Sequence, residues 1–118
     1  MGEMSFAGGV YTTLPARSYT DEALFAEEKA KIFRRSWQLV GHANDIPKAG
    51  DYVVEDVSGT SVIVMRGQDG EIRAFYNVCV HRGHELLEGK GCARKMTCPY
   101  HAWTYDTTGQ LRAAPNAA

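Results

Sequence analysis

The spacing of hydrophobic positions divides the chain into a helical part and a β part. Over residues 21–36 the apolar side chains recur at a helical spacing and share one face, which carries Phe25, Ile32 and Phe33. Thr20 can cap this segment, and the two acidic residues that follow suit the positive N-terminal end of a helix. The pattern predicts one helix over residues 21–36.

The remainder of the chain shows short runs rich in β-branched and aromatic residues. These runs are residues 38–40, 51–57, 61–65, 72–78 and 103–105, with a further short run at Leu111. Glycine-containing segments separate them, at residues 48–50, 58–60, 67–70 and 106–109. Because glycine readily adopts the positive φ of tight turns, adjacent runs are predicted to pair as antiparallel hairpins. A mainly β fold with one N-terminal helix follows.

Domain organisation is simple. Residues 1–14 are small and polar without periodicity, which predicts a flexible N-terminal arm. The chain of 118 residues is too short for two independent cores, so residues 15–118 are expected to form a single domain.

Composition and charge remove several classes of function. Thirteen basic and fourteen acidic residues leave a net charge of -1, so no nucleic-acid or anionic-lipid partner is expected. No apolar run approaches the length of a membrane span and no secretory signal is evident, so a cytoplasmic location is expected. Three cysteines cannot all pair, and a reducing compartment favours free thiols or metal ligands.

Two short Cys/His motifs carry the candidate chemistry. Cys79 and His81 stand two positions apart, and Cys98 and His101 stand three apart. Two thiolates and two neutral imidazoles suit an iron–sulfur cluster whose two irons are chemically unequal. The same donor set also makes a closed tetrahedral zinc site, which remains the structural alternative.

The pairing of C-x-H with C-x-x-H resembles the signature of Rieske [2Fe–2S] proteins. The resemblance implies an antiparallel β-sandwich with a cluster-binding subdomain of two hairpin loops. It also implies that Cys79 and Cys98 hold one iron and that His81 and His101 hold the other. Cys92, in a glycine-rich turn, and His42 match neither half of the signature and are expected to be unligated.

Residues outside the signature make the resemblance more specific. Residues 30–42, Arg82-Gly83 and 103–106 are similar to the N-terminal domain of Rieske non-haem iron oxygenase α subunits. The similarity is greatest to those that act on carnitine and related quaternary ammonium compounds, and aromatic-ring hydroxylases are expected to share less. A stand-alone Rieske ferredoxin is the alternative. Ferredoxins of this type usually begin directly with the sheet, so the N-terminal segment of this chain favours the oxygenase.

The resemblance also assigns the surroundings of the cluster. Arg82, His84, Tyr100 and Trp103 would surround it, and Trp103 would pack beneath the loops. Respiratory Rieske proteins place a disulfide where this chain has His84 and Tyr100, and a hydroxyl donor where it has Ala102-Trp103. Without those groups, a reduction potential at the low end of the Rieske range, about −150 mV, is expected.

The function implied is one-electron transfer at the point of electron entry into an oxygenase. An NAD(P)H-dependent reductase or a ferredoxin would deliver electrons, and His101 would be the exit toward a neighbouring α subunit in a trimer. A mononuclear iron in a separate catalytic domain would carry out mono- or dioxygenation of a small organic substrate. The chain is therefore expected to be a piece of a longer oxygenase, inactive in oxygenation by itself.

Overall fold

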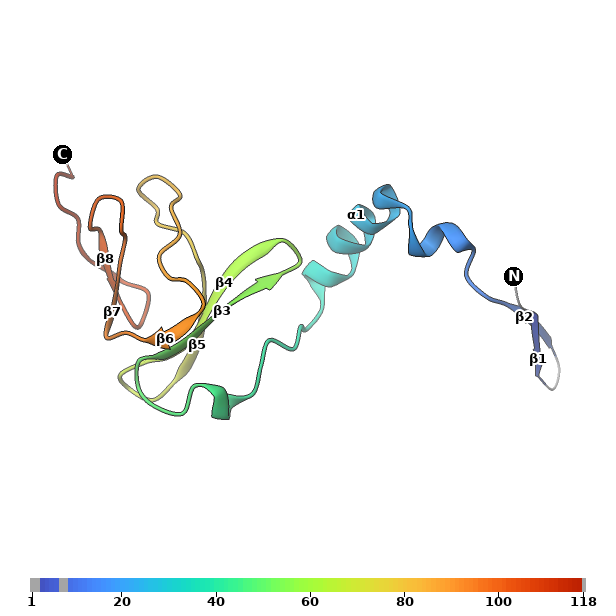
Figure 1. Cartoon of the computed structure of the whole chain (residues 1–118), viewed down its shortest axis with the longest axis horizontal. Coiled ribbons are helices and arrows are strands. Elements are labelled where there is room, and N and C mark those ends of the chain that lie inside the picture. Colours follow the sequence, from blue (N-terminus) through green and yellow to red (C-terminus); the bar gives the residue numbers. More distant parts are fainter. Residues whose placement is uncertain (1–2, 7–8, 118) are drawn as a thin grey trace. The chain divides into compact units, whose positions relative to one another are not determined.

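The computed structural model describes residues 3–6 and 9–117 (Figure 1). The chain falls into two compact units, residues 1–38 and residues 39–118. The two Cys/His motifs lie in the second unit.

The first unit begins with a short hairpin inside the predicted arm. Strand β1 (Glu3–Phe6) pairs antiparallel with β2 (Gly9–Thr12). A 3₁₀ turn, η1 (Ala16–Tyr19), follows. This pairing was not predicted, because residues 1–14 show no periodicity in their sequence. The flexibility of the arm stays a prediction.

Helix α1 (Glu22–Lys31) confirms the predicted helix but is shorter than expected. Asp21 caps it, because its carboxylate accepts two backbone N–H groups of the first turn, at 2.9 and 3.2 Å; the prediction that Thr20 caps it was wrong. A separate 3₁₀ turn, η2 (Phe33–Arg35), replaces the predicted last turn. No helix in the described part of the chain is long and apolar enough to cross a membrane.

The second unit contains a four-stranded antiparallel sheet in the order β5-β4-β3-β6. Its strands are β3 (Asp51–Val57), β4 (Thr60–Arg66), β5 (Ile72–Tyr76) and β6 (Lys90–Cys92). The predicted hairpin between β3 and β4 is confirmed: Val57 pairs with Thr60, and Ser58 and Gly59 between them both have positive φ, 54° and 81°. Two central residues with positive φ make the turn that matches the twist of the flanking strands.

A three-stranded antiparallel sheet, in the order β7-β8-β9, completes the second unit. Its strands are β7 (Lys95–Thr97), β8 (Thr104–Asp106) and β9 (Leu111–Ala113). The mainly β, antiparallel fold class is confirmed. Strands β6 and β7 were not predicted, because three residues are too few to show a period.

Two expectations for the segment before β3 were wrong. Residues 38–40 form no strand, and the next element is the 3₁₀ turn η3 (Ala43–Asp45). Residues 48–50 therefore do not connect a hairpin. Gly50 instead allows the backbone near Ala93 to pass close by, because a Cβ at position 50 would lie 2.8 Å from the carbonyl oxygen of Ala93. Its φ of 92° also favours glycine.

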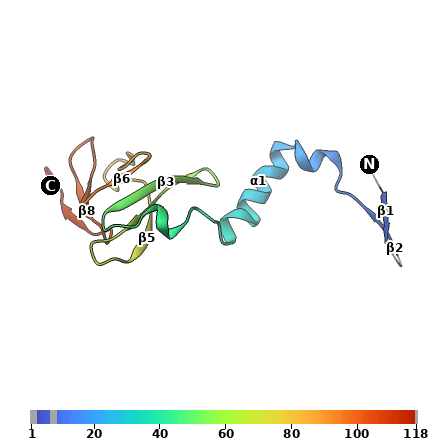
Figure 2. The ribbon, with the colours of Figure 1, turned by 60° about the horizontal axis from the view of Figure 1, so that its bottom comes forward.

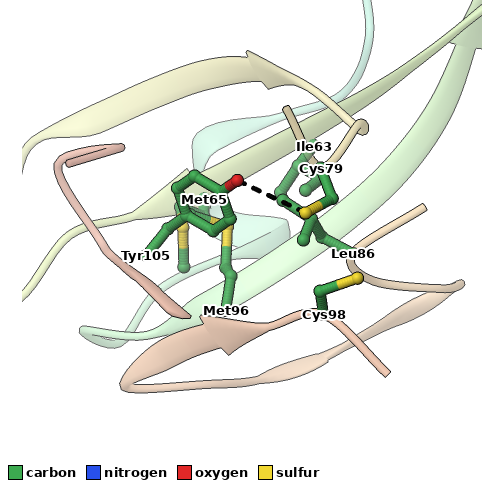
Figure 3. Packing of buried hydrophobic residues seen from close by; sticks show 7 residues of the cluster. All are labelled: Ile63, Met65, Cys79, Leu86, Met96, Cys98 and Tyr105. Atoms are coloured by element: carbon green, nitrogen blue, oxygen red, sulfur yellow. Dashed lines mark hydrogen bonds between the residues drawn. The ribbon is translucent and has the colours of Figure 1, made fainter. Parts of the chain in front are cut away.

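The core of the second unit draws on both sheets. Its buried cluster consists of Ile63, Met65, Cys79, Leu86, Met96, Cys98 and Tyr105 (Figure 3). Met65 on β4 and Met96 on β7 are almost fully buried, at 0% and 1% exposure. Figure 3 shows the two cysteines at the same end of this cluster, beside Leu86. The core thus reaches the base of the loops that carry the Cys/His motifs.

Candidate metal centre

Two loops of the second unit extend side by side and carry the motifs (Figures 1 and 2). The first loop, residues 79–84, lies between β5 and β6, and the second loop, residues 98–103, lies between β7 and β8. In both loops the cysteine carbonyl accepts the backbone N–H four residues later, at 2.8 Å from Gly83 and 3.0 Å from Ala102. The cysteine N–H in turn donates to the carbonyl five residues later, at 2.7 and 2.8 Å. The loops therefore share one backbone frame.

The thiols lie at the buried base of the loops. Cys79 is 1% and Cys98 3% exposed. The Tyr105 hydroxyl lies 3.4 Å from Cys79 Sγ (Figure 3) and accepts the Val80 N–H at 3.2 Å. Burial raises the pKa of the Cys79 thiol, but hydrogen bonds from Tyr105, from backbone N–H groups of its own loop and from Cys98 outweigh it, so the pKa lies below its usual value. The base of the site thus favours a thiolate, the form that binds metal.

The imidazoles lie at the exposed tips of the same loops. The rings of His81 and His101 meet edge to face, with centroids 4.8 Å apart and planes at 75°. Partial desolvation lowers the pKa of His101, and the nearby charges of His81 and Arg82 lower it further. The side chain of His101 is exposed within its own chain.

Aromatic side chains hold the imidazoles from both sides. Trp103 stacks on His81 with ring centroids 4.5 Å apart and planes at 10°, and it packs against the buried cluster. The ring centroid of Tyr100 lies 3.9 Å from that of His101 in its own loop and 5.9 Å from that of His84 in the other loop. The structure thus brings together three of the four residues expected around the site, while Arg82 lies exposed at the tip of the first loop.

Asn77 anchors the first loop and was missed from the sequence. Its buried side-chain oxygen accepts the backbone N–H groups of Leu86 and Leu87, at 2.8 and 3.1 Å, and its amide donates to the Leu87 carbonyl at 2.8 Å. These bonds replace the strand pairing that ends with β5. The available signal was an asparagine directly after residues 74–76, which end the predicted strand in small and aromatic side chains, and just before the first Cys/His motif. The hydroxyl of Tyr105, also missed, left no such signal.

Cys92 and His42 lie elsewhere in the second unit. Cys92 is exposed on β6, and its thiol lies 3.7 Å from the Ala49 carbonyl oxygen. His42 caps η3, because its Nδ1 accepts the Asn44 N–H at 3.1 Å. Both placements agree with a local structural role.

The donor set consists of two thiols at the buried base and two imidazoles at the exposed tips. Among the described residues, no group of three or more His, Cys, Asp or Glu side chains gathers around the position of one ion. A binuclear iron–sulfur cofactor takes only two protein ligands per iron. The donor set of two soft thiols and two neutral imidazoles has the chemistry that the two unequal irons of such a cofactor require.

Residues 36–118 match the family described as the Rieske [2Fe-2S] domain. The chain belongs to this family. The matched range includes both loops, both sheets of the second unit and the core between them. A Rieske domain binds a [2Fe–2S] cluster, so the expected cofactor and the Rieske-type fold are confirmed.

Similar curated proteins are oxygenase subunits. The carnitine monooxygenase oxygenase subunit of Escherichia coli (strain K12) is 49% identical over 105 residues, which cover 88% of this chain and 28% of the relative. The α subunit of biphenyl 2,3-dioxygenase from Rhodococcus jostii (strain RHA1) is 48% identical over 103 residues, covering 86% and 22%. The chain therefore spans about a quarter of the length of these relatives. As expected, this aromatic-ring enzyme shares less of the sequence than the carnitine enzyme, although the difference is small.

Solved structures agree with the sequence matches. The quaternary ammonium Rieske monooxygenase CntA in complex with L-carnitine has a TM-score of 0.84 at 47% identity, covering 88% of this chain and 30% of that one. Naphthalene 1,2-dioxygenase from Rhodococcus sp. bound to indole has a TM-score of 0.84 at 38% identity, covering 87% and 24%. Another CntA structure is described as revealing carnitine oxidation by gut microbiota and inter-subunit electron transfer.

Proposed function

We propose that this Rieske domain holds its cluster through Cys79 and Cys98 on one iron and His81 and His101 on the other, and that it is the electron-entry domain of an oxygenase α subunit. The observation that carries this proposal is the common backbone frame of the two loops, which sets two buried thiols below two exposed imidazoles.

The cluster, when bound, accepts and releases one electron at a time. The protein contributes a buried pair of thiolates, stabilised at Cys79 by the Tyr105 hydroxyl and by backbone N–H groups. The two imidazoles are neutral ligands, so the site carries less negative charge than a four-cysteine site and electron uptake is electrostatically easier. Their exposed edges provide the route by which an electron enters or leaves.

His101 is the proposed exit. A metal-bound imidazole turns its second nitrogen outward to a partner that fixes its orientation, and the exposed tip of the second loop leaves that nitrogen accessible. The partner would be a carboxylate of a neighbouring α subunit, in line with the inter-subunit electron transfer described for the carnitine relative. An assembly of such subunits, a trimer in the whole enzyme, completes the path to a mononuclear iron.

The electron donor would be an NAD(P)H-dependent reductase or a ferredoxin. The name "oxygenase subunit" of the carnitine relative supports a separate reducing component. Such a donor fits a cytoplasmic location, and so do three cysteines that form no disulfide with one another.

Two observations favour an oxygenase over a stand-alone ferredoxin. The relatives are oxygenase subunits, and the 105-residue match to the carnitine enzyme is longer than the Rieske range 36–118, so it includes the N-terminal helical part. Because monooxygenase and dioxygenase subunits match almost equally well, the proposal names mono- or dioxygenation of a small organic substrate in the whole enzyme and no particular substrate.

Replacing single cysteines in the cluster-loaded chain tests the ligand set. Cys79→Ser and Cys98→Ser should each abolish the visible absorption and the bound iron and sulfide, because a hydroxyl is a poor replacement for a thiolate on iron. Cys92→Ser is the matched control and should keep its colour. Loss of colour in the control, or one tightly bound zinc in the purified chain with no sulfide, would refute the assignment.

Replacement of His101 tests the exit separately. In an oxygenase that contains this domain, His101→Cys should retain iron but add negative charge and remove the outward N–H. Transfer of an electron from the reduced cluster to the catalytic iron should slow sharply in single-turnover measurements. Unchanged transfer in a variant that still contains its cluster would exclude His101 as the exit.

A further inference from the structure

Trp103 belongs to the site by two contacts, one of its side chain and one of its backbone. Its ring lies nearly parallel to that of the proposed ligand His81, with centroids 4.5 Å apart and planes at 10°. Its backbone carbonyl accepts the N–H of the proposed ligand Cys98 at 2.8 Å. Trp103 therefore connects the thiol base of the second loop to the imidazole tip of the first.

The indole N–H of Trp103 is buried without a partner. Nε1 has no hydrogen-bond acceptor among the described residues, and it is the single buried side-chain nitrogen or oxygen of that part of the chain in this condition. Native proteins pair nearly all buried donors, because an unpaired donor loses its bonds to water and gains nothing in return. The N–H is thus a donor whose acceptor is not supplied by the described residues.

The surroundings narrow the choice of acceptor. Bulk solvent does not reach the nitrogen, since the atom is buried. The thiol of Cys79 bonds to Tyr105 and to its own loop, and neither cysteine accepts the indole N–H in the chain alone. A bound cluster would bring new acceptors, its sulfur atoms, to the ligand set that includes the His81 ring on which Trp103 stacks.

We propose that the Trp103 indole donates a hydrogen bond to a sulfur of the bound cluster while its ring holds His81 in place. This inference rests on the proposed ligand set. A donor to sulfur stabilises the reduced, more negative cluster more than the oxidised one, so Trp103 raises the reduction potential. The expectation that position 103 lacks any such donor, made from the missing hydroxyl alone, is thereby revised.

Replacement of the N–H by sulfur tests the bond without changing the shape of the ring. In the cluster-loaded chain, 3-benzothienylalanine at position 103 keeps the stacked bicyclic ring but has no donor. The equilibrium constant for one-electron reduction should fall roughly fivefold, which is about 40 mV at 59 mV per tenfold change. Trp103→Phe should shift the potential in the same direction, and Trp37→Phe, the chain's other tryptophan, is the control that should leave it unchanged.

Spectroscopy provides a second readout that a purely structural role would not move. With ¹⁵N-labelled indole in the Trp37→Phe background, the reduced cluster should show a hyperfine coupling to the Trp103 nitrogen in pulsed electron paramagnetic resonance. In a chain that contains its cluster, an unchanged reduction potential with benzothienylalanine, or no ¹⁵N coupling, would overturn the inference. Absence of iron and sulfide from the unsubstituted chain would instead refute the ligand set, so the two failures are distinguishable.

Discussion

Gly83 and Ala102 occupy equivalent positions in the two loops. Each donates its backbone N–H to the carbonyl of the cysteine four residues earlier, and each has positive φ, 74° for Gly83 and 59° for Ala102. Glycine adopts this conformation without steric penalty, whereas an alanine Cβ crowds the following carbonyl oxygen. The second loop therefore carries a local strain that the first loop avoids.

Ala102→Gly should relieve this strain. Relief of the left-handed conformation outweighs the larger chain entropy of glycine, so the free energy of unfolding should stay equal or rise by up to about 1 kcal/mol. Urea denaturation of the chain measures this change. Ala74→Gly, at an exposed position of β5, is the control and should lose about 0.5–1 kcal/mol. Equal losses in the two variants would contradict the strain at Ala102.

Gly83→Ala should have the opposite effect to Ala102→Gly. A Cβ at Gly83 has no heavy atom within 4 Å, so the penalty comes from the backbone conformation alone. We expect a loss of about 1 kcal/mol in the free energy of unfolding, with the cluster still bound. Loss of the cluster at unchanged stability would show that position 83 has a direct role at the site.

Tyr105→Phe should lower the reduction potential. The variant removes the hydroxyl 3.4 Å from Cys79 Sγ, a bond that stabilises the thiolate more when the cluster is reduced. A neutral hydrogen bond of about 1 kcal/mol corresponds to about 40 mV for one electron. Direct electrochemistry of the loaded chain measures the shift. Tyr76→Phe, at a tyrosine that is 72% exposed, should leave the potential unchanged.

Asn77→Ala should destabilise the first loop. It leaves the backbone N–H groups of Leu86 and Leu87 without their acceptor in a buried environment, which we expect to cost about 3 kcal/mol of unfolding free energy. The cluster should also be lost faster during incubation with a chelator. Asn77→Asp keeps the acceptor and should lose less. A loss as small as that of Asn44→Ala, at an exposed asparagine, would contradict the anchoring role.

Acid should weaken the β4–β5 connection through Asp69. Hydrogen bonds from the Arg73 side chain hold the pKa of the Asp69 carboxyl at about 2, below its usual 3.8. Because the pKa is depressed in the folded state, this contribution is present above pH 3.8 and is lost as the pH falls toward 2. Urea denaturation of the cofactor-free chain at a series of pH values measures the loss. Asp69→Asn should be less stable near neutrality and should show a flatter profile over the same interval.

The sequence by itself determined the two Cys/His motifs and the longest strands. Cysteine and histidine two or three positions apart must share one tight loop, so their grouping is a local property that spacing reveals. Likewise β3 and β4 have seven residues each and enclose a two-residue turn with positive φ, and these are signals that act over neighbouring positions. Residues 38–40 carry the same kind of β pattern, but they form no strand because a strand needs a partner.

Only the tertiary structure decided which side chains complete the site. Tyr105 meets Cys79 across 26 positions of sequence, and Trp103 meets His81 across the two loops. The three-residue strand β6 pairs with the seven-residue β3, and β7 pairs with β8, so each of these short strands depends on a partner strand that is distant in the sequence or across a loop. Such contacts depend on how the two sheets enclose their common core. Local spacing contains no information about that packing, since hydrogen bonds and ring contacts between distant residues are selected by the whole fold.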